Sequence, residues 1–505
     1  MGSDSDKDCL DKEIQIYERE RNFTMEKKYF TYEEFGAVGD GVQDDLPAIV
    51  ACHEAANRMG LPVKAKDGAV YYIGGKNITA VVKTDVDFGT ARFIIDDREV
   101  ELITSYVFSV ESDYDFERVE LHALSRGQKK LNIGKDGNYL VRVYDETHPV
   151  FIRKGLNMNN GTATQDIFLI DGDGNIYSSV NFDYPTVTRA EAKCVDDAPI
   201  TLRGGIFTTI ANQQESFYRY HQRGIHVSRS HVTLCDFQHY VEGEGDHGAP
   251  YHGFIRSDYI SDLTVKDGIV TSRRTYWTAS KIPGKDVPMG SYDLSFWSSI
   301  NVRCINVKQT IDITDNRYWG VYTSNFCKGL HIEDCVFSRF DAHMGVTDFL
   351  IKNCRLGHQG VQLIGFGEGV IENTEVNSVA FFSLRGDYGS TWTGTINIKN
   401  CVWNPKGANS SVFTASNDED HDFGYFCTEP ETINIDGLRI NDAVLGDKPV
   451  YLAAKFTGAS VDGEKVAPYG RVKNYTVRGL TTESGRRVEL CERPELYPEV
   501  NVTVE

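Results

Sequence analysis

Residues 332–376 read "IEDCVFSRFDAHMGVTDFLIKNCRLGHQGVQLIGFGEGVIENTEV" and contain one six-residue pattern three times. The pattern is an apolar residue, two mostly polar residues, a small or apolar residue, any residue and a final apolar residue; it begins at Ile332, Ile351 and Ile371. Further copies begin near Leu234 and at Val265, Val302, Ile398, Ile435 and Val472. Successive copies start between 19 and 37 residues apart, so a fixed segment recurs with connections of variable length.

The repeated segment predicts β-strands in a solenoid. Apolar positions alternate with polar ones, β-branched residues are frequent, and no long stretch between the copies shows a helical period. The connections are rich in Gly, Asn and Asp and too short for the helical crossovers that parallel strands otherwise need. We therefore expect an all-β chain folded as a parallel β-helix, in which each turn hydrogen-bonds to the next.

Three cysteines, Cys335, Cys354 and Cys401, occupy the same position of the pattern. Free cysteine behaves as a small hydrophobic residue, so we expect these thiols to stack inside the coil. The chain has eleven cysteines but neither a CxxC pair nor a Cys/His zinc spacing. Neither a disulfide framework nor a zinc site is predicted.

The segment 29–60 precedes the coil and differs from it. Glycines in 36–41 predict a turn, Asp44 and Asp45 are suited to start a helix, and 46–59 has the period of an amphipathic helix. A solenoid needs its open end covered, so this helix is expected to cap the coil.

Within this segment, "FGAVGDGVQDDLPAIVACHEAA" (35–56) closely resembles the "FGAxGDGxxDDTxAIxxAxxxA" opening of the pectate lyase superfamily of right-handed parallel β-helix proteins. The resemblance implies a right-handed coil over most of the chain and an action on carbohydrate. Because that superfamily includes lyases, hydrolases, epimerases and phage tailspikes, it does not imply one reaction.

These observations predict one β-helix domain, 29–505, after a polar leader, 1–28. Its parts are a cap segment (29–60), early coils with insertions or a small inserted β subdomain (100–230), and regular coils (230–480).

The formal net charge of -20 argues against nucleic acid or an anionic membrane as partner, since both select basic surfaces. The sequence contains no run of eighteen apolar residues, so no transmembrane span is predicted.

The opening "MGSDSDKDCLDKE" lacks an apolar signal core and reads as a truncated leader. With the family resemblance, this favours a secreted, periplasmic or cell-surface protein, or a lipoprotein whose signal has been removed. The oligomeric state stays open.

Charged side chains gather on adjacent turns near the middle of the coil. Arg339 and His358 lie at the same offset from the start of two consecutive copies, so we expect them side by side. One turn later "FFSLRGDYGSTW" (381–392) brings more charged groups after an apolar strand. A structural ion pair is the alternative interpretation. The candidate catalytic residues are His343, His358, Arg385, Tyr388, Arg339, Asp341 and Asp387.

Aromatic and basic residues on other turns could line a carbohydrate groove, because aromatic faces stack on sugars while charged groups orient hydroxyls or carboxylates. Packing is the alternative role for such aromatics. The candidate substrate-binding residues are Trp319, Tyr276, Trp277, Arg274, His252 and Trp392.

No metal site and no cofactor are predicted. Calcium stays open because pectate lyases use a calcium cluster of aspartates, for which the sequence has no clear equivalent.

A uronate-cleaving lyase must neutralise the sugar carboxylate, remove the C5 proton and protonate the departing C4 oxygen. Arg385 or Arg339 could neutralise the charge, His343 or His358 could be the base, and Tyr388 could donate the proton.

A glycoside hydrolase needs two carboxylates, for which Asp341 and Asp387 come first and Asp315 and Asp246 second. A noncatalytic glycan-binding β-helix is the third possibility. Histidine and arginine outnumber convincing carboxylate pairs, so the sequence favours a lyase with a polysaccharide substrate. The expected substrate contains uronate: a glycosaminoglycan such as chondroitin or hyaluronan, or a pectin-like polymer.

Overall fold

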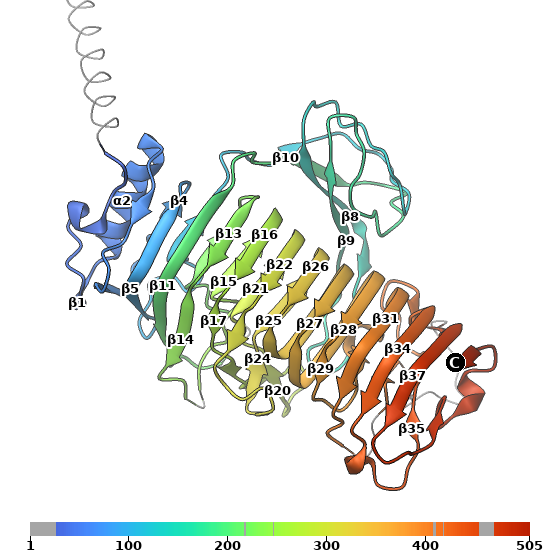
Figure 1. Cartoon of the computed structure of the whole chain (residues 1–505). Helices are drawn as coiled ribbons and strands as arrows, with labels where there is room; N and C mark the ends of the chain where they lie inside the picture. Colours follow the sequence, from blue (N-terminus) through green and yellow to red (C-terminus); the bar gives the residue numbers. More distant parts are fainter. Residues whose placement is uncertain are drawn as a thin grey trace, which may run out of the picture.

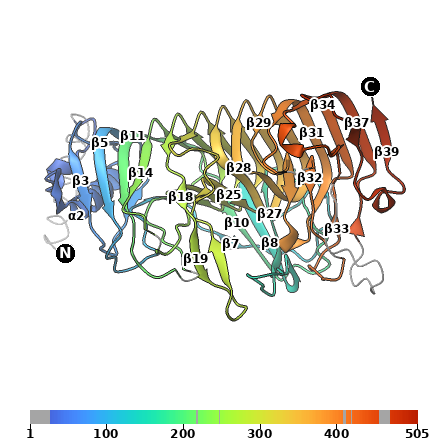
Figure 2. The same cartoon turned by 90° about the horizontal axis from the view of Figure 1, so that it is seen from below.

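The computed structural model of the chain describes residues 27–216, 219–245, 247–407, 411–417, 419–453 and 469–504. The strands form a long coil that runs from helix α2 (Leu46–Met59) at one end to strand β39 (Asn501–Val504) at the other (Figures 1 and 2). The strands of successive turns pair in parallel, which confirms the predicted all-β parallel β-helix. No helix in these ranges is long and apolar enough to cross a membrane.

The parallel pairings define three stacks of strands that follow one another around each turn, and long strands such as β27 and β28 contribute to all three. Stack 1 contains β2 (Val63–Lys64), β5 (Val86–Asp96), β11 (Ile200–Ile210), β13 (Val232–Cys235), β16 (Ser261–Lys266), β22 (Ile300–Ile305), β26 (Lys328–Glu333), β31 (Trp392–Trp403), β34 (Thr432–Ile440), β37 (Asn474–Thr482) and β39. Stack 2 adds β1 (Asp40–Asp44), β3 (Val70–Ile73), β14 (Gln238–Glu242), β17 (Ile269–Val270), β23 (Lys308–Gln309) and β29 (Glu375–Val376). Stack 3 contains β4 (Ala80–Val82), β6 (Phe108–Val110), β12 (Ile225–Val227), β15 (Ile255–Asp258), β21 (Leu294–Trp297), β25 (Tyr322–Asn325), β27 (Val336–Lys352), β28 (Arg355–Glu372), β30 (Phe382–Leu384) and β32 (Phe413–Thr414).

The sequence repeat forms the corner between stacks 1 and 2. The third residue of each copy of the six-residue pattern has a positive φ, which Asn, Asp and Gly tolerate better than other residues. The residues at this position are Asp236, Asp267, Asn306, Asp334, Asn353, Asn373, Asn400, Gly437 and Gly479. Their side chains bond along the coil, as in the 2.8 Å hydrogen bond from Asn306 Nδ2 to Asp267 Oδ1.

Two copies of the repeat were placed out of register by the sequence pattern. The pairing aligns Cys304 with Ile332 and Ile435 with Val477, so the copies do not start at Val302 and Val472. Short alternating apolar runs fit several starting points, whereas the residue with positive φ fixes the register. The predicted inward thiol stack is confirmed, because every cysteine of that stack is buried.

The predicted cap helix is confirmed as α2, with the bounds expected from the sequence. Its Leu46, Ile49 and Cys52 are fully buried against the first strands of the coil. Asp45 does not cap the helix with its side chain; its carboxylate instead accepts hydrogen bonds from the backbone of Val38 (2.7 Å) and Gly39 (3.1 Å). The glycine-rich turn is thereby fixed to the start of the helix.

A four-stranded antiparallel sheet interrupts the early coils and projects from the side of the coil in Figure 1. Its strands are β7 (Glu117–Arg118), β8 (Tyr139–Val150), β9 (Thr162–Ile170) and β10 (Arg189–Cys194). It has its own apolar core around Val141, Val143 and Phe168. A buried ion pair between Asp166 of the inserted sheet and Lys328 of the coil anchors the sheet to the coil.

The remaining strands form short pairs outside the three stacks. They are β18 (Arg273–Arg274) with β24 (Tyr318–Gly320), β19 (Tyr276–Ala279) with β20 (Asp286–Met289), β33 (Cys427–Thr428) with β36 (Tyr469–Gly470), and β35 (Val450–Tyr451) with β38 (Val488–Glu489). The β19–β20 pair is an antiparallel hairpin, and its loop reaches the pocket described below.

Candidate active site

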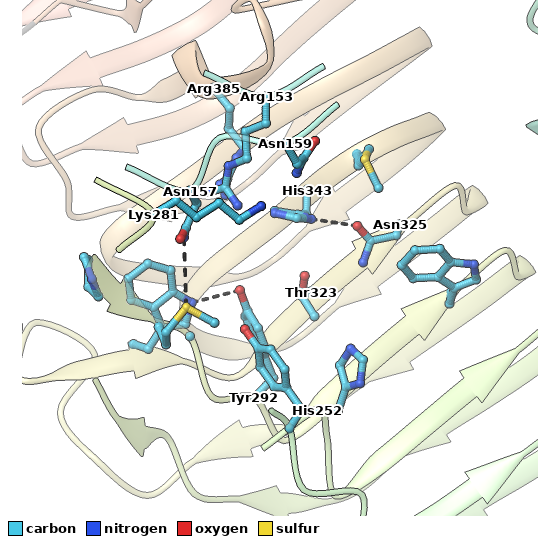
Figure 3. Close-up of a pocket in the computed structure, with 17 residues that line it drawn as sticks. Arg153, Asn157, Asn159, His252, Lys281, Tyr292, Thr323, Asn325, His343 and Arg385 are labelled. Atoms are coloured by element: carbon cyan, nitrogen blue, oxygen red, sulfur yellow. Dashed lines mark hydrogen bonds between the residues drawn. The ribbon is translucent and has the colours of Figure 1, made fainter. Parts of the chain in front are cut away.

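A pocket of about 390 Å³ lies on the outer face of stack 3. Tyr322 of β25 points into the core, so Thr323 and Asn325 on the same strand point outward and form part of the pocket floor. The 151–161 connection between β8 and β9 covers one side, and the hairpin loop 280–285 covers another. The pocket is therefore built from the regular coil and from two excursions that leave it (Figure 3).

His343 of β27 lies half-buried in this pocket. Its Nδ1 lies 2.7 Å from Oδ1 of Asn325, an acceptor, so Nδ1 carries the ring proton and Nε2 keeps a lone pair. In Figure 3 the second ring nitrogen points away from Asn325, toward the side on which Lys281 and Arg385 lie. Burial, together with the positive charge of Arg385, lowers the pKa of His343 to about 3. The imidazole is therefore neutral at physiological pH.

Three arginines and two aspartates form a chain of ion pairs beside His343. Arg339 lies 2.6 Å from Asp341, and Arg385 bonds both Asp341 (3.1 Å) and Asp387 (3.0 Å). Arg153, from the 151–161 connection, lies 2.7 Å from Asp387. Three guanidinium groups and two carboxylates leave a net charge of +1 in the chain.

Both carboxylates in this chain are ionised. Burial works against ionisation, but the guanidinium groups of Arg339 and Arg385 outweigh it and hold the pKa of Asp341 below its usual range. Arg385 and Arg153 do the same for the pKa of Asp387. Asp341 is completely buried, and neither carboxylate lines the pocket. The two carboxylates pair with the arginines outside the pocket lining and hold the guanidinium groups in position.

The charges that do line the pocket are all positive. Arg153, Lys281 and Arg385 are the charged side chains among its lining residues, which include no Asp or Glu in the described ranges. The pocket lining is therefore positively charged, although the formal net charge of the whole chain is -20. The arrangement favours an anionic ligand.

Of the seven predicted catalytic residues, only His343 and Arg385 line the pocket. Arg339, Asp341 and Asp387 belong to the chain of ion pairs behind it, and Tyr388 and His358 also lie outside the lining. Tyr388 is buried below it, with its ring 5.2 Å from the Arg153 guanidinium and 5.5 Å from the His343 ring. His358 was expected beside Arg339, but Arg339 pairs with Gly360, because β28 carries two extra residues at this bend. The His358 ring turns instead to the carbonyl oxygen of Ile313, 3.2 Å from Nδ1.

The second pair of predicted carboxylates gives no clear acid and base. Asp315 lies outside the pocket lining and pairs with Arg317 at 2.5 Å on an exposed loop. Asp246 lies outside the described residues.

Two of the predicted substrate-binding residues line the pocket, Trp319 and His252. Trp319 donates a 2.9 Å hydrogen bond to the hydroxyl of Tyr292, and the Arg339 guanidinium lies 4.7 Å from its ring. The other predicted residues do not line the pocket. Tyr276 and Trp392 are buried, Trp277 is 61% exposed, and Arg274 lies at the β18–β24 pair.

Trp392 and Trp277 offer a matched pair for testing this placement. Trp392 is fully buried in the core, so Trp392→Ala is expected to lower the free energy of unfolding by about 3–5 kcal/mol. Trp277→Ala removes an exposed side chain, and its effect is expected to be within about 0.5 kcal/mol. Denaturant unfolding of both variants measures the difference. Equal effects would contradict the placement of the two rings.

Most residues that line the pocket were not predicted from the sequence, among them Arg153, Lys281, Tyr292 and Asn325. Arg153 and Lys281 lie on excursions without the repeat, so no periodicity relates them to His343. Asn325 could have been found, because it follows the outward-facing Thr323 by two residues on a strand of stack 3.

The described residues contain no group of three or more His, Cys, Asp or Glu side chains that could hold a metal ion. The prediction of no cofactor, with calcium left open, stays a prediction.

No protein-family model matches the chain, and no curated protein sequence does. Solved structures do match it. The tailspike gp61 of Pseudomonas phage phi297 is similar with a TM-score of 0.51 and 11% identity, over 94% of this chain and 84% of the tailspike. The gp54 tailspike of Acinetobacter baumannii bacteriophage AP22, solved in complex with an A. baumannii capsular saccharide, has a TM-score of 0.50 and 10% identity, over 90% of this chain and 76% of that one. At these identities the likeness supports the fold.

Proposed function

We propose that this protein is an extracytoplasmic polysaccharide lyase that cleaves a uronate-containing polysaccharide by β-elimination. The observation that carries the proposal is the pocket that combines Arg153, Lys281 and Arg385 with the neutral imidazole of His343. The complex of the similarly folded AP22 tailspike with a capsular saccharide supports a polysaccharide as the class of ligand. Such polymers lie outside the cytoplasm, so a secreted, periplasmic or cell-surface location fits this substrate.

The positive side chains serve the first requirement of the elimination. The proton on C5 of a uronate becomes acidic only when the negative charge that develops on the adjacent carboxylate is neutralised. Arg385, Arg153 and Lys281 line the pocket and supply the positive charge that neutralises it. Asp341 and Asp387 act as positioning residues that orient the guanidinium groups.

His343 is the proposed base. Its Nε2 lone pair takes the C5 proton, the C5–H electrons form the C4–C5 double bond, and the C4–O bond breaks. In the free protein the low pKa of His343 weakens it as a base. A bound uronate carboxylate offsets the positive charge of Arg385 and thereby raises the pKa of His343 when the substrate is in place.

Tyr292 takes the role of acid that the sequence suggested for Tyr388. It lines the pocket, and its hydroxyl oxygen accepts a hydrogen bond from Trp319, so its own proton remains available to the departing C4 oxygen. Burial raises the pKa of Tyr292, which keeps the phenol protonated. Tyr388 is buried below the pocket, where it supports the rings and guanidinium groups above it.

A hydrolase mechanism on Asp341 and Asp387 fits less well. Both retaining and inverting glycosidases need one carboxyl group that is protonated near neutral pH. Both of these pKa values are lowered, and both groups are engaged by arginines.

The proposal is tested by incubating the purified protein with chondroitin, hyaluronan, pectate and alginate in separate reactions. A lyase produces a conjugated unsaturated uronate, which is followed by its ultraviolet absorbance. We expect this absorbance to rise with at least one polymer and the His343→Ala variant to abolish the rise. New reducing ends without the absorbance would indicate hydrolysis, and neither signal would favour a binding protein.

The pH dependence gives an independent test. The base form of His343 is lost only as the pH falls toward its pKa of about 3. We therefore expect kcat/KM, which reports on the free enzyme, to stay nearly constant from pH 8 to pH 5. A histidine with the ordinary pKa of about 6.5 would lose roughly thirtyfold by pH 5. An acid limb near pH 6.5 would contradict the assignment of His343.

A further inference from the structure

The two ends of the pocket differ in chemistry. Arg153 and Arg385 lie at one end, and Tyr220 and His252 belong to the other. Figure 3 shows His252 across the pocket from both arginines, with Thr323, Asn325 and His343 between them.

The two lining residues named at the second end, Tyr220 and His252, offer no positive charge. The ring of Tyr220 stacks on that of His252, with centroids 4.8 Å apart. Burial lowers the pKa of His252 to about 3, so its ring is neutral. The neighbouring Arg256 is held by Asp258 through two hydrogen bonds of 2.7 Å each and does not line the pocket.

The two ends are separated by more than one sugar ring. His252 precedes β15, and the Arg385 guanidinium reaches back to Asp341 on β27. From β15 to β27 the coil advances by three strand pairings, through β21 and β25. At the usual strand spacing this is about 14 Å along the coil. A saccharide in the pocket would therefore place neighbouring sugars at the two ends.

We propose that the substrate is a polymer in which uronate alternates with an uncharged sugar, and that Tyr220 and His252 form the subsite for the uncharged sugar. The inference rests on the proposed function, which places a uronate at the arginine end. A polymer made only of uronates would bring a second carboxylate to the Tyr220–His252 end, where neither of these two rings can pair with it. The preference for the alternating polymer then comes from the free-energy cost of leaving the second carboxylate of a uronate homopolymer unpaired.

Binding measurements test this separately from activity. The His343→Ala variant is titrated calorimetrically with oligosaccharides of equal length: hyaluronan and chondroitin fragments, which alternate, and oligogalacturonate and oligomannuronate, which do not. We expect an alternating fragment to bind about tenfold tighter than either homopolymer, the effect of one unpaired charge. Equal binding, or tighter binding of a homopolymer, would overturn the inference.

A positive charge introduced at the Tyr220–His252 end gives a second test of the assigned subsite. Tyr220→Lys on the same background is expected to reduce the preference for the alternating fragment, because the lysine can pair with the second carboxylate. Tyr177→Lys is the matched control, since Tyr177 lies in the connection between β9 and β10, is 70% exposed and does not line the pocket. An unchanged preference in Tyr220→Lys, with native unfolding, would contradict the assigned subsite.

The outcomes separate this inference from the proposed function. A preference for alternating fragments without any unsaturated product would support the subsite and refute the lyase. Unsaturated product formed equally well from homopolymers would support the lyase and refute the subsite. Failure of every fragment to bind would refute both.

Discussion

Replacing Arg385 with glutamine is expected to lower kcat/KM by about a thousandfold on a polymer that the wild-type protein cleaves. Arg385 lines the pocket, and its positive charge lowers the pKa of His343 more than the charge of Arg153 does. Its removal leaves the developing charge on the uronate without its main partner. Glutamine keeps hydrogen-bonding capacity, and Asp341 and Asp387 keep Arg339 and Arg153 as partners, so the fold is expected to survive.

The matched control is Arg317→Gln, on an exposed loop. Arg317 also pairs with an aspartate two residues away, Asp315, but its side chain is 67% exposed and does not line the pocket. We expect this variant to retain wild-type kcat/KM. Unfolding midpoints of both variants distinguish lost catalysis from lost structure. A folded Arg385→Gln protein with wild-type activity would contradict the proposed charge neutralisation.

His343→Ala is expected to lower kcat by about a thousandfold with a smaller change in KM, because a general base acts in the transition state more than in binding. His358→Ala is expected to leave kcat unchanged, since His358 faces Ile313 and lies outside the pocket lining. Steady-state kinetics on the same polymer measure both. Loss of activity in His358→Ala but not in His343→Ala would reverse the assignment.

A surface histidine provides the control for this substitution. His331 pairs with Glu333 at 3.0 Å on a neighbouring strand, away from the pocket, and His331→Ala should behave like wild type. His343→Gln adds a second test, because it preserves much of the volume but has no basic nitrogen. Substantial activity in His343→Gln would show that His343 has a structural role only.

The fold was largely predictable because its determinants are local and repeated. An Asn, Asp or Gly recurs where the backbone needs a positive φ, and the apolar residues around it face the interior. The register of two copies was wrong, at Val302 and Val472, because an alternating apolar pattern fits several starting points. The antiparallel sheet between β7 and β10 lacks the repeat, so its strand order could not be derived from it.

The site was only partly predictable. His343 and Arg385 were found because they lie on or directly after strands of the coil, and the structure brings them to one pocket with the predicted Trp319 and His252. Arg153 could not be found, since it reaches His343 only through the path of the 151–161 connection. The offset of Arg339 and His358 in the sequence was misleading, because a bend with two extra residues in β28 separates their side chains.

The chemistry of bond cleavage is tested most directly by the mass of the products. Elimination splits the polymer without adding water, so the masses of the fragments sum to that of the starting oligosaccharide. Hydrolysis adds one water molecule for each bond cleaved. We predict that mass spectrometry of a defined uronate oligosaccharide, after incubation with the wild-type protein, finds fragments with no added water and one unsaturated end. Fragments that together carry an added water would contradict the lyase mechanism.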